Sequence, residues 1–318
     1  LFKNILIQGD IKMYGYWGKI LRVDLSNGLI REEGADESFF KKYIGGVGIA
    51  AKIILNEVGP DVEPFSPDNI IVIGVGPFQG TKVPGSGRWI VASKSPLTGI
   101  WADSCAGGNL GPEFKRMGFD ALIIKGKASL PVYLWINDEK VEIRDASKIW
   151  GKKTSETDKE IKKDLGEPKA KIACIGPGGE KLIRFASVIN EHGIAGRCGL
   201  GAVFGSKNLK AIAVTGTKQV EIAESEELNK FCKILSKKYY NATVNTMRKY
   251  GTTASLKKYY DRGYRLAKNW REWKFEEVDK IDGKHFLDIT IKPIACTYCP
   301  IACHRRTKVT QPEKYAYE

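Results

Sequence analysis

Two stretches of the sequence share one design, and this internal similarity constrains the fold more than any other feature. The first runs from Ala106 to Gly126 and the second from Ala195 to Gly216. Each opens with Ala-Gly and a glycine-rich loop, continues through a short helical segment that contains a lysine, and ends in an apolar strand closed by glycine. Self-similarity of this kind is typical of duplicated architectures. We therefore expect two similar halves that present two equivalent loops.

Both glycine-rich loops have the chemistry of a phosphate-binding site. Small residues let backbone amides approach a ligand closely, and the N-terminus of a following helix adds positive potential. Arg88, in the segment PGSGRWIVASKSPLTG, would add a bidentate phosphate contact. Neither loop matches a Walker A or a dinucleotide-binding motif. Tight turns alone would also explain each loop, but two matched loops favour a ligand with two-fold character or two copies of one ligand.

The first two thirds of the chain mix strand and helix patterns. Apolar alternation over residues 17–31 predicts a strand that enters a type I′ hairpin turn at Asn27-Gly28. Residues 36–58 predict a helix interrupted by glycines, and residues 68–78 a buried strand. A second hairpin is expected around Asn137-Asp138. These patterns together predict an α+β domain.

The pattern changes after Val220. Ser225 precedes two glutamates, as an N-cap does, and apolar residues then recur at helical spacing up to Tyr239. Residues 252–264 predict another short helix. A chain of 318 residues can form two domains. We expect an α+β domain over residues 13–220 and the start of a mainly α-helical domain over residues 221–318.

Composition narrows the classes of partner and compartment. The chain is 42% hydrophobic and 28% charged, and it has no apolar run of the roughly 18 residues that a membrane span requires. It carries a formal net charge of +14, but the lysines are dispersed and form no arginine-rich block, which argues against nucleic acid. Two explanations of the positive charge remain, a solvated lysine-rich surface and an acidic protein partner. We expect a cytoplasmic protein without membrane attachment, whose four scattered cysteines are reduced thiols.

Three further cysteines are Cys296, Cys299 and Cys303. Two residues lie between the first pair and three between the second. Clustered thiolates with a proline after the second favour an iron–sulfur cluster whose fourth ligand lies farther away. Zinc is an alternative, with His304 as fourth ligand, but two adjacent residues would then have to reach one ion. Thiols that bind no metal are the third alternative. The spacing is the reverse of the radical S-adenosylmethionine pattern, which disfavours that chemistry.

Beyond these local patterns, the chain resembles the N-terminal half of the tungsten-containing aldehyde ferredoxin oxidoreductase family over about residues 13–318. The matching segments include YGYWGKILRVDLSNG, GPFQGTKVPGSGRWIVASKSPLTG, GFDALIIKGKASLPVYLWI, EIRDASKIWGKKTSETD, GLGAVFGSKNLKAIAV, KYGT at 249–252 and the cysteine loop. The resemblance implies an N-terminal domain of two similar, intertwined β-rich halves. This domain would form a base for a tungsten bis-pyranopterin cofactor of the molybdopterin type, and helical domains would cover it.

The resemblance also implies roles for individual residues. One pyranopterin would be contacted by Arg88, Cys105, Ala106, Gly107 and Gly108, and the other by Gly196 and Arg197. The three clustered cysteines would bind a [4Fe–4S] cluster whose fourth ligand lies outside this chain. Glu318 would be the counterpart of an active-site glutamate, and a magnesium ion is a further candidate. The sequence departs from the family pattern at Cys105, which replaces asparagine, and at Gly193, which replaces a basic residue in a loop one residue shorter.

The implied reaction is oxidation of a small aldehyde to a carboxylic acid, with electrons leaving through the cluster to ferredoxin. A C-terminal half, in this protein or in a second chain, would complete the active site, and the resemblance is compatible with a homodimer. We therefore expect the isolated 318-residue chain to be inactive. The alternatives are an inactive truncated or split remnant, or a family member that reduces carboxylic acids or aromatic thioesters.

Overall fold

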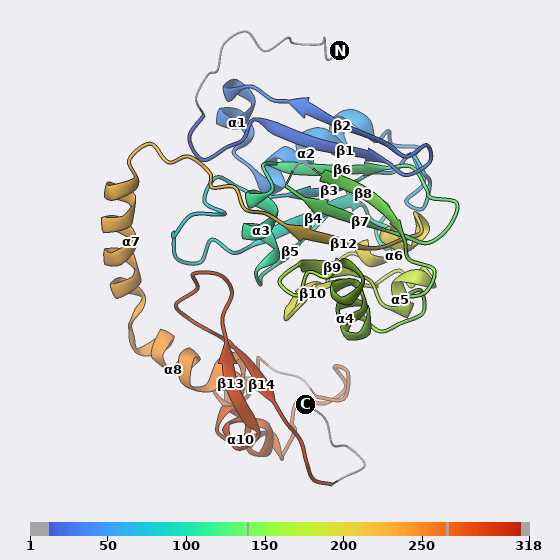
Figure 1. Ribbon diagram of the computed structural model, residues 1–318. Coiled ribbons are helices and arrows are strands. Elements are labelled where there is room, and N and C mark those ends of the chain that lie inside the picture. The colour runs from blue at the N-terminus through green and yellow to red at the C-terminus, as the bar shows by residue number, and fades with distance from the viewer. Residues whose placement is uncertain (1–12, 139, 265–266, 313–318) are drawn as a thin grey trace. The chain divides into compact units, whose positions relative to one another are not determined.

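The computed structural model describes residues 13–138, 140–264 and 267–312 (Figure 1). By its internal contacts the chain divides into two compact units, Leu1–Ser225 and Glu226–Glu318. The first unit contains two β-sheets with their helices, and the second contains short helices and one small hairpin.

The first sheet of the N-terminal unit has six strands. In spatial order these are β2 (Leu29–Gly34), β1 (Lys19–Asp24), β6 (Ala121–Lys125), β3 (Ile71–Gly74), β4 (Trp89–Lys94) and β5 (Trp101–Ala106). Strands β1 and β6 run parallel, and the other neighbouring strands run antiparallel.

The second sheet repeats this topology six strands later. In spatial order its strands are β8 (Lys140–Asp145), β7 (Val132–Asn137), β12 (Leu209–Thr215), β9 (Lys171–Cys174), β10 (Val188–Asn190) and β11 (Gly193–Ala195). The parallel pair is again the first and sixth strand of the half, β7 and β12. The predicted duplication is therefore confirmed, and so is the α+β class.

Helices occupy equivalent places in the two halves. Between the second and third strands lie α1 (Glu37–Tyr43) and α2 (Gly46–Glu57) in the first half and α4 (Thr154–Leu165) in the second. Between the fifth and sixth strands lie α3 (Leu110–Arg116) and α6 (Leu200–Ser206). The short helix α5 (Pro177–Glu180) follows β9.

Strand alternation builds a layered core. In β6, Leu122 and Ile124 face a central cluster, whereas Ile123 faces a second cluster formed with α1 and α2. In β7, Leu134 joins the same central cluster, and Trp135 packs on the other face with α4. Successive side chains of a strand point to opposite faces, so strands that are buried on both sides are apolar throughout. The two sheets thus share one central core, and helices cover their outer faces.

The two halves are intertwined through their short helices. Helix α3 of the first half contacts β9 and β12 of the second, and helix α6 of the second half contacts β4 of the first. Phe114 of α3 and Phe204 of α6 occupy equivalent positions in the duplicated stretches, and both are fully buried in the central core. Each half therefore completes the core of the other.

The first predicted hairpin is present, but its predicted turn type is wrong. Four residues, Leu25–Gly28, connect β1 to β2. A type I′ turn needs positive φ at both central residues, whereas φ is positive at Gly28 (72°) and not at Asn27. The Asp24 carboxylate accepts a hydrogen bond from the backbone N–H of Ser26 (2.9 Å). Side-chain bonds of this kind stabilise the longer turn.

The predicted interruption of helix 36–58 is confirmed. Asp36 caps α1 by accepting the N–H of Phe39 (2.8 Å). The chain then breaks at Ile44, where φ is 61°, and restarts as α2. A Cβ atom at Gly48 would lie 2.2 Å from the carbonyl oxygen of Tyr43, so the close approach of α2 to the end of α1 requires glycine there.

The second unit contains short elements. They are α7 (Ser225–Tyr239), α8 (Ala242–Tyr250), η1 (Gly251–Ser255), α9 (Leu256–Asp261), η2 (Val278–Ile281), α10 (Gly283–Asp288), β13 (Thr290–Ile294) and β14 (His304–Thr307). Strands β13 and β14 form an antiparallel hairpin around the three clustered cysteines, where the sequence predicted only a loop. In the part of the chain that the structure describes, no helix has the length and apolarity needed to cross a bilayer.

Candidate cofactor site and cysteine loop

The first glycine-rich loop begins at the end of strand β5. Alternation along this strand exposes Cys105 and buries Ser104 and Ala106. Arg88 is exposed just before the neighbouring strand β4, and its guanidinium contacts the Cys105 sulfur at 3.6 Å. The pairing of β4 with β5 thus places a cation beside an exposed thiol and the glycines that follow it.

The second glycine-rich loop packs directly against the first. The backbone N–H of Arg197 donates to the hydroxyl of Ser104 (3.1 Å), and the hydroxyl of Ser95 donates to the carbonyl of Cys198 (2.7 Å). Gly199 has φ of 71°, and a Cβ atom there would lie 1.8 Å from the carbonyl oxygen of Arg184. Only glycine fits this position, which ends the loop and starts α6.

Asn190 joins the two loops. Its Nδ2 donates to the carbonyl of Gly107 (3.1 Å), and its Oδ1 accepts from Trp89 Nε1 (3.2 Å). A Cβ atom at Gly193 would lie 2.4 Å from the Gly107 carbonyl oxygen. The contact between the loops therefore requires glycine at position 193 in this protein.

The predicted pyranopterin residues therefore form one surface. Cys105, Gly196, Arg88 and Arg197 are exposed there, whereas Ala106 and Gly108 are buried in its support. Two guanidinium groups beside glycine-rich backbone can bind an anionic, phosphate-bearing group. The residues present thus fit a pyranopterin. Prediction from sequence missed Ser104 and Asn190, which are buried polar residues of strands β5 and β10. Ser104 alternates with Ala102 and Ala106 on the buried face of β5, and this alternation is the signal that could have revealed it.

Three lysines of the N-terminal unit are buried and have polar partners. Lys115 pairs with Asp120, and Lys210 pairs with Glu180. Lys207 instead donates to the carbonyls of Pro67 (3.1 Å) and Gly126 (3.0 Å). Burial lowers the pKa of Lys207 to about 8.

The cysteine loop of the second unit is a compact turn. The N–H of Cys299 donates to the carbonyl of Cys296 (3.0 Å), and all three thiols are half-buried. Left-handed conformations at Tyr298 (φ 50°) and Ala302 (φ 49°) separate the cysteines. Among the described residues, no three Cys, His, Asp or Glu side chains gather closely enough to form a metal site. The donor set of three local thiols fits an iron–sulfur cluster chemically, and its role stays a prediction.

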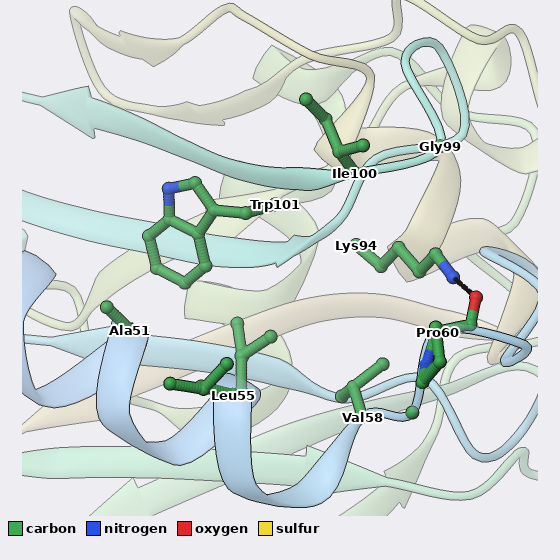
Figure 2. Close-up of a pocket in the computed structure, with 10 residues that line it drawn as sticks. Ala51, Leu55, Val58, Pro60, Lys94, Gly99, Ile100 and Trp101 are labelled. Carbon is green, nitrogen blue, oxygen red and sulfur yellow. Dashed lines mark hydrogen bonds between the residues drawn. The ribbon is translucent and has the colours of Figure 1, made fainter.

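The predicted active-site glutamate, Glu318, lies outside the described residues. An apolar groove of about 510 Å³ lies between α2 and the β4–β5 turn (Figure 2), at the opposite end of β5 from Cys105. Lys94 stands at one end of this groove and donates to the carbonyl of Pro60 (2.5 Å). The groove is lined by none of the predicted cofactor residues.

Comparison with known proteins decides the family. The model of the aldehyde ferredoxin oxidoreductase N-terminal domain matches residues 20–216, and the model of domains 2 and 3 of the same family matches residues 230–318. The chain belongs to the aldehyde ferredoxin oxidoreductase family. The resemblance predicted from sequence motifs is thus confirmed.

Two relatives and one solved structure show how far the similarity extends along the chain. It is 45% identical to a tungsten-containing aldehyde ferredoxin oxidoreductase of Pyrococcus abyssi, over 92% of this chain and 49% of the relative. It is 36% identical to the WOR-like subunit of an aliphatic sulfonate oxidoreductase of Pyrococcus furiosus, over 92% and 49%. The active-site complex BamBC of benzoyl coenzyme A reductase superposes with a TM-score of 0.82 at 34% identity, over 94% of this chain and 48% of that one. The chain thus spans about half the length of these relatives and corresponds to their N-terminal half.

Proposed function

We propose that this chain is the cofactor-binding part of a tungsten-dependent oxidoreductase that oxidises aldehydes to carboxylic acids and delivers electrons to ferredoxin. The observation that carries the proposal is the convergence of the two duplicated loops, through Asn190 and Ser104, into one surface with Arg88 and Arg197. Residues 13–220 would form the pyranopterin-binding domain, and residues 221–318 the start of the helical domain with the cluster loop.

Within the first domain, the chain's own residues bind and orient the cofactor. Arg88 would donate charge-assisted hydrogen bonds to an anionic group of one pyranopterin, beside Cys105 and the glycines after it. The guanidinium of Arg197 would do the same for the second pyranopterin, beside the small residue Gly196. When bound, the tungsten centre supplies the two-electron redox chemistry, and the protein supplies position, electrostatics and exclusion of water.

In the second domain, Cys296, Cys299 and Cys303 would supply three thiolate ligands of a [4Fe–4S] cluster. The compact turn from Cys296 to Cys299 and the half-buried thiols support this assignment. The fourth ligand would come from the part of the enzyme that corresponds to the second half of the relatives.

Charge distribution supports an acidic electron acceptor such as ferredoxin. Residues 226–318 contain 20 Lys and Arg against 11 Asp and Glu, a net charge of +9 out of +14 for the whole chain. A positive surface accelerates the encounter with an acidic partner and makes the rate dependent on salt. We place this partner, like the enzyme, in the cytoplasm.

One relative favours a second candidate function. The structural similarity to benzoyl coenzyme A reductase suggests reduction of an aromatic thioester. The higher identity to the Pyrococcus abyssi enzyme, 45% against 34%, favours the aldehyde.

Metal analysis and turnover test the proposal. The natively assembled protein, with the part that completes it, should contain tungsten and about four irons for each copy of this chain. It should reduce a viologen dye with crotonaldehyde and not with the dienoyl thioester that reduction of a benzoyl thioester yields. Zinc as the only metal would contradict the proposed function.

A further inference from the structure

The backbone of the cysteine loop is held to helix α8 by one arginine side chain. Arg305 Nη1 donates to two carbonyls of the loop, those of Ala302 (2.6 Å) and His304 (2.7 Å). Its Nη2 donates to two carbonyls near the C-terminus of α8, those of Met247 (3.2 Å) and Arg248. The guanidinium therefore bridges four carbonyls of two segments that are more than fifty residues apart in sequence.

The contacts between α8 and the loop are reciprocal. The guanidinium of Arg248 donates to the carbonyl of Pro300, directly after Cys299. The N–H of Thr252 donates to the carbonyl of Cys303 (3.2 Å), and a Cβ atom at Gly251 would lie only 2.8 Å from the same oxygen. These bonds, together with those of Arg305, hold four carbonyls of the loop, those of Pro300, Ala302, Cys303 and His304.

Only arginine has the geometry for this contact. Its guanidinium is planar, permanently charged and carries five N–H donors in a fixed fork, whereas a lysine ammonium is a point charge with three donors. The last carbonyls of a helix also lack partners within the helix and attract cations. Arg305 satisfies both requirements at once, because it lies between the end of α8 and the loop.

We propose that Arg305 is a positioning residue for the metal cluster. Arg305 holds the backbone between and beside Cys299 and Cys303 in one conformation before iron binds. This role rests on the proposed function, in which both cysteines are cluster ligands. Ligands that are fixed in advance bind a metal group more tightly, and loss of such outer contacts typically costs about 10–100-fold in metal affinity.

The test compares the arginine with conservative and neighbouring changes in the natively assembled protein. The variants are Arg305→Lys, Arg305→Gln and Arg248→Gln, and the matched control is Arg306→Gln, which removes the same charge from the adjacent, exposed residue of β14. The measurements are the electron paramagnetic resonance spectrum of the reduced protein and the rate at which a chelator removes iron. We expect Arg305→Lys and Arg305→Gln to lose iron about tenfold faster and to change the spectrum, Arg248→Gln to do so more weakly, and the control to match the wild type.

The outcomes distinguish positioning by the guanidinium fork from a simple effect of positive charge. If Arg305→Lys keeps the wild-type spectrum and rate, charge alone is sufficient and the inference is wrong. An equal effect of Arg306→Gln also overturns it. If circular dichroism shows that the Arg305 variants do not fold, Arg248→Gln provides the test. A wild-type cluster in that variant would contradict the inference that the contacts between α8 and the loop position the cluster ligands. A wild-type protein without any cluster would instead overturn the proposed function itself.

Discussion

Trp89 of the first half and Asn190 of the second half are joined by a hydrogen bond of 3.2 Å from the indole Nε1 to the amide Oδ1. Both residues are buried, and the same amide donates to the carbonyl of Gly107 in the first glycine-rich loop. This bond links the duplicated halves at the point where their loops meet. The base of the candidate cofactor site is thus part of the protein core.

We expect Asn190→Ala to destabilise the chain by about 2 kcal/mol, because it leaves the Trp89 N–H and the Gly107 carbonyl buried without this partner. Urea unfolding measures the difference in free energy. The control is Asn56→Ala at an exposed position of helix α2, which should change stability by less than about 0.5 kcal/mol. Equal effects of the two changes would contradict the linking role of Asn190.

Lys207 predicts a pH dependence of stability. Its pKa is about 8 in the folded protein, below its ordinary value of 10.5, because burial disfavours the ammonium. Between about pH 8 and pH 10.5 the unfolded chain binds more protons than the folded one, so the free energy of unfolding rises with pH. Over this whole range the free energy of unfolding increases by about 3 kcal/mol.

The measurement compares the wild type with Lys207→Met by urea unfolding from pH 7 to pH 10. All other titrating groups are common to both proteins and cancel in the difference. The wild type should gain stability relative to the variant as the pH rises above about 8. A constant difference over this range would show that Lys207 is not the group responsible.

The cysteines of the loop should be required for the metal cluster, whereas Cys174 should not. In the natively assembled protein, Cys299→Ser should abolish or destabilise the cluster, since a harder oxygen replaces a soft thiolate ligand. Cys174→Ser should leave the cluster intact. Cys174 is buried in β9, burial raises the pKa of its thiol to about 12, and its sulfur contacts the carbonyl of Thr154 at 3.7 Å. Electron paramagnetic resonance of the reduced proteins compares the two variants, and a wild-type signal in Cys299→Ser would remove Cys299 from the ligand set.

Arg88 should govern cofactor loading. Arg88→Ala removes a charge-assisted contact worth about 1.5–3 kcal/mol, so we expect roughly 10–100-fold weaker retention of the pyranopterin. Pterin fluorescence after oxidative release, measured together with tungsten content, gives the loading. The control is Arg31→Ala at an exposed position of strand β2, which should load as the wild type does. Full loading of the Arg88 variant would exclude this arginine from the site.

The sequence alone determined the features that depend on neighbouring residues. Apolar alternation and turn residues predicted the hairpins, glycines predicted the break between α1 and α2, and the duplicated stretches predicted two similar halves. The motifs also identified the family. Even locally, the turn type after β1 was mispredicted, because side-chain hydrogen bonds favoured a longer turn.

Only the tertiary structure decided which residues meet. Trp89 and Asn190 are 101 residues apart, and Ser104 and Arg197 are 93 apart, so no local pattern could pair them. The low pKa of Lys207 likewise follows from burial between distant loops, and the role of Arg305 follows from its position at the end of α8. Adjacent residues determine the local backbone preferences, whereas burial and these hydrogen-bond partners arise only when distant segments pack together.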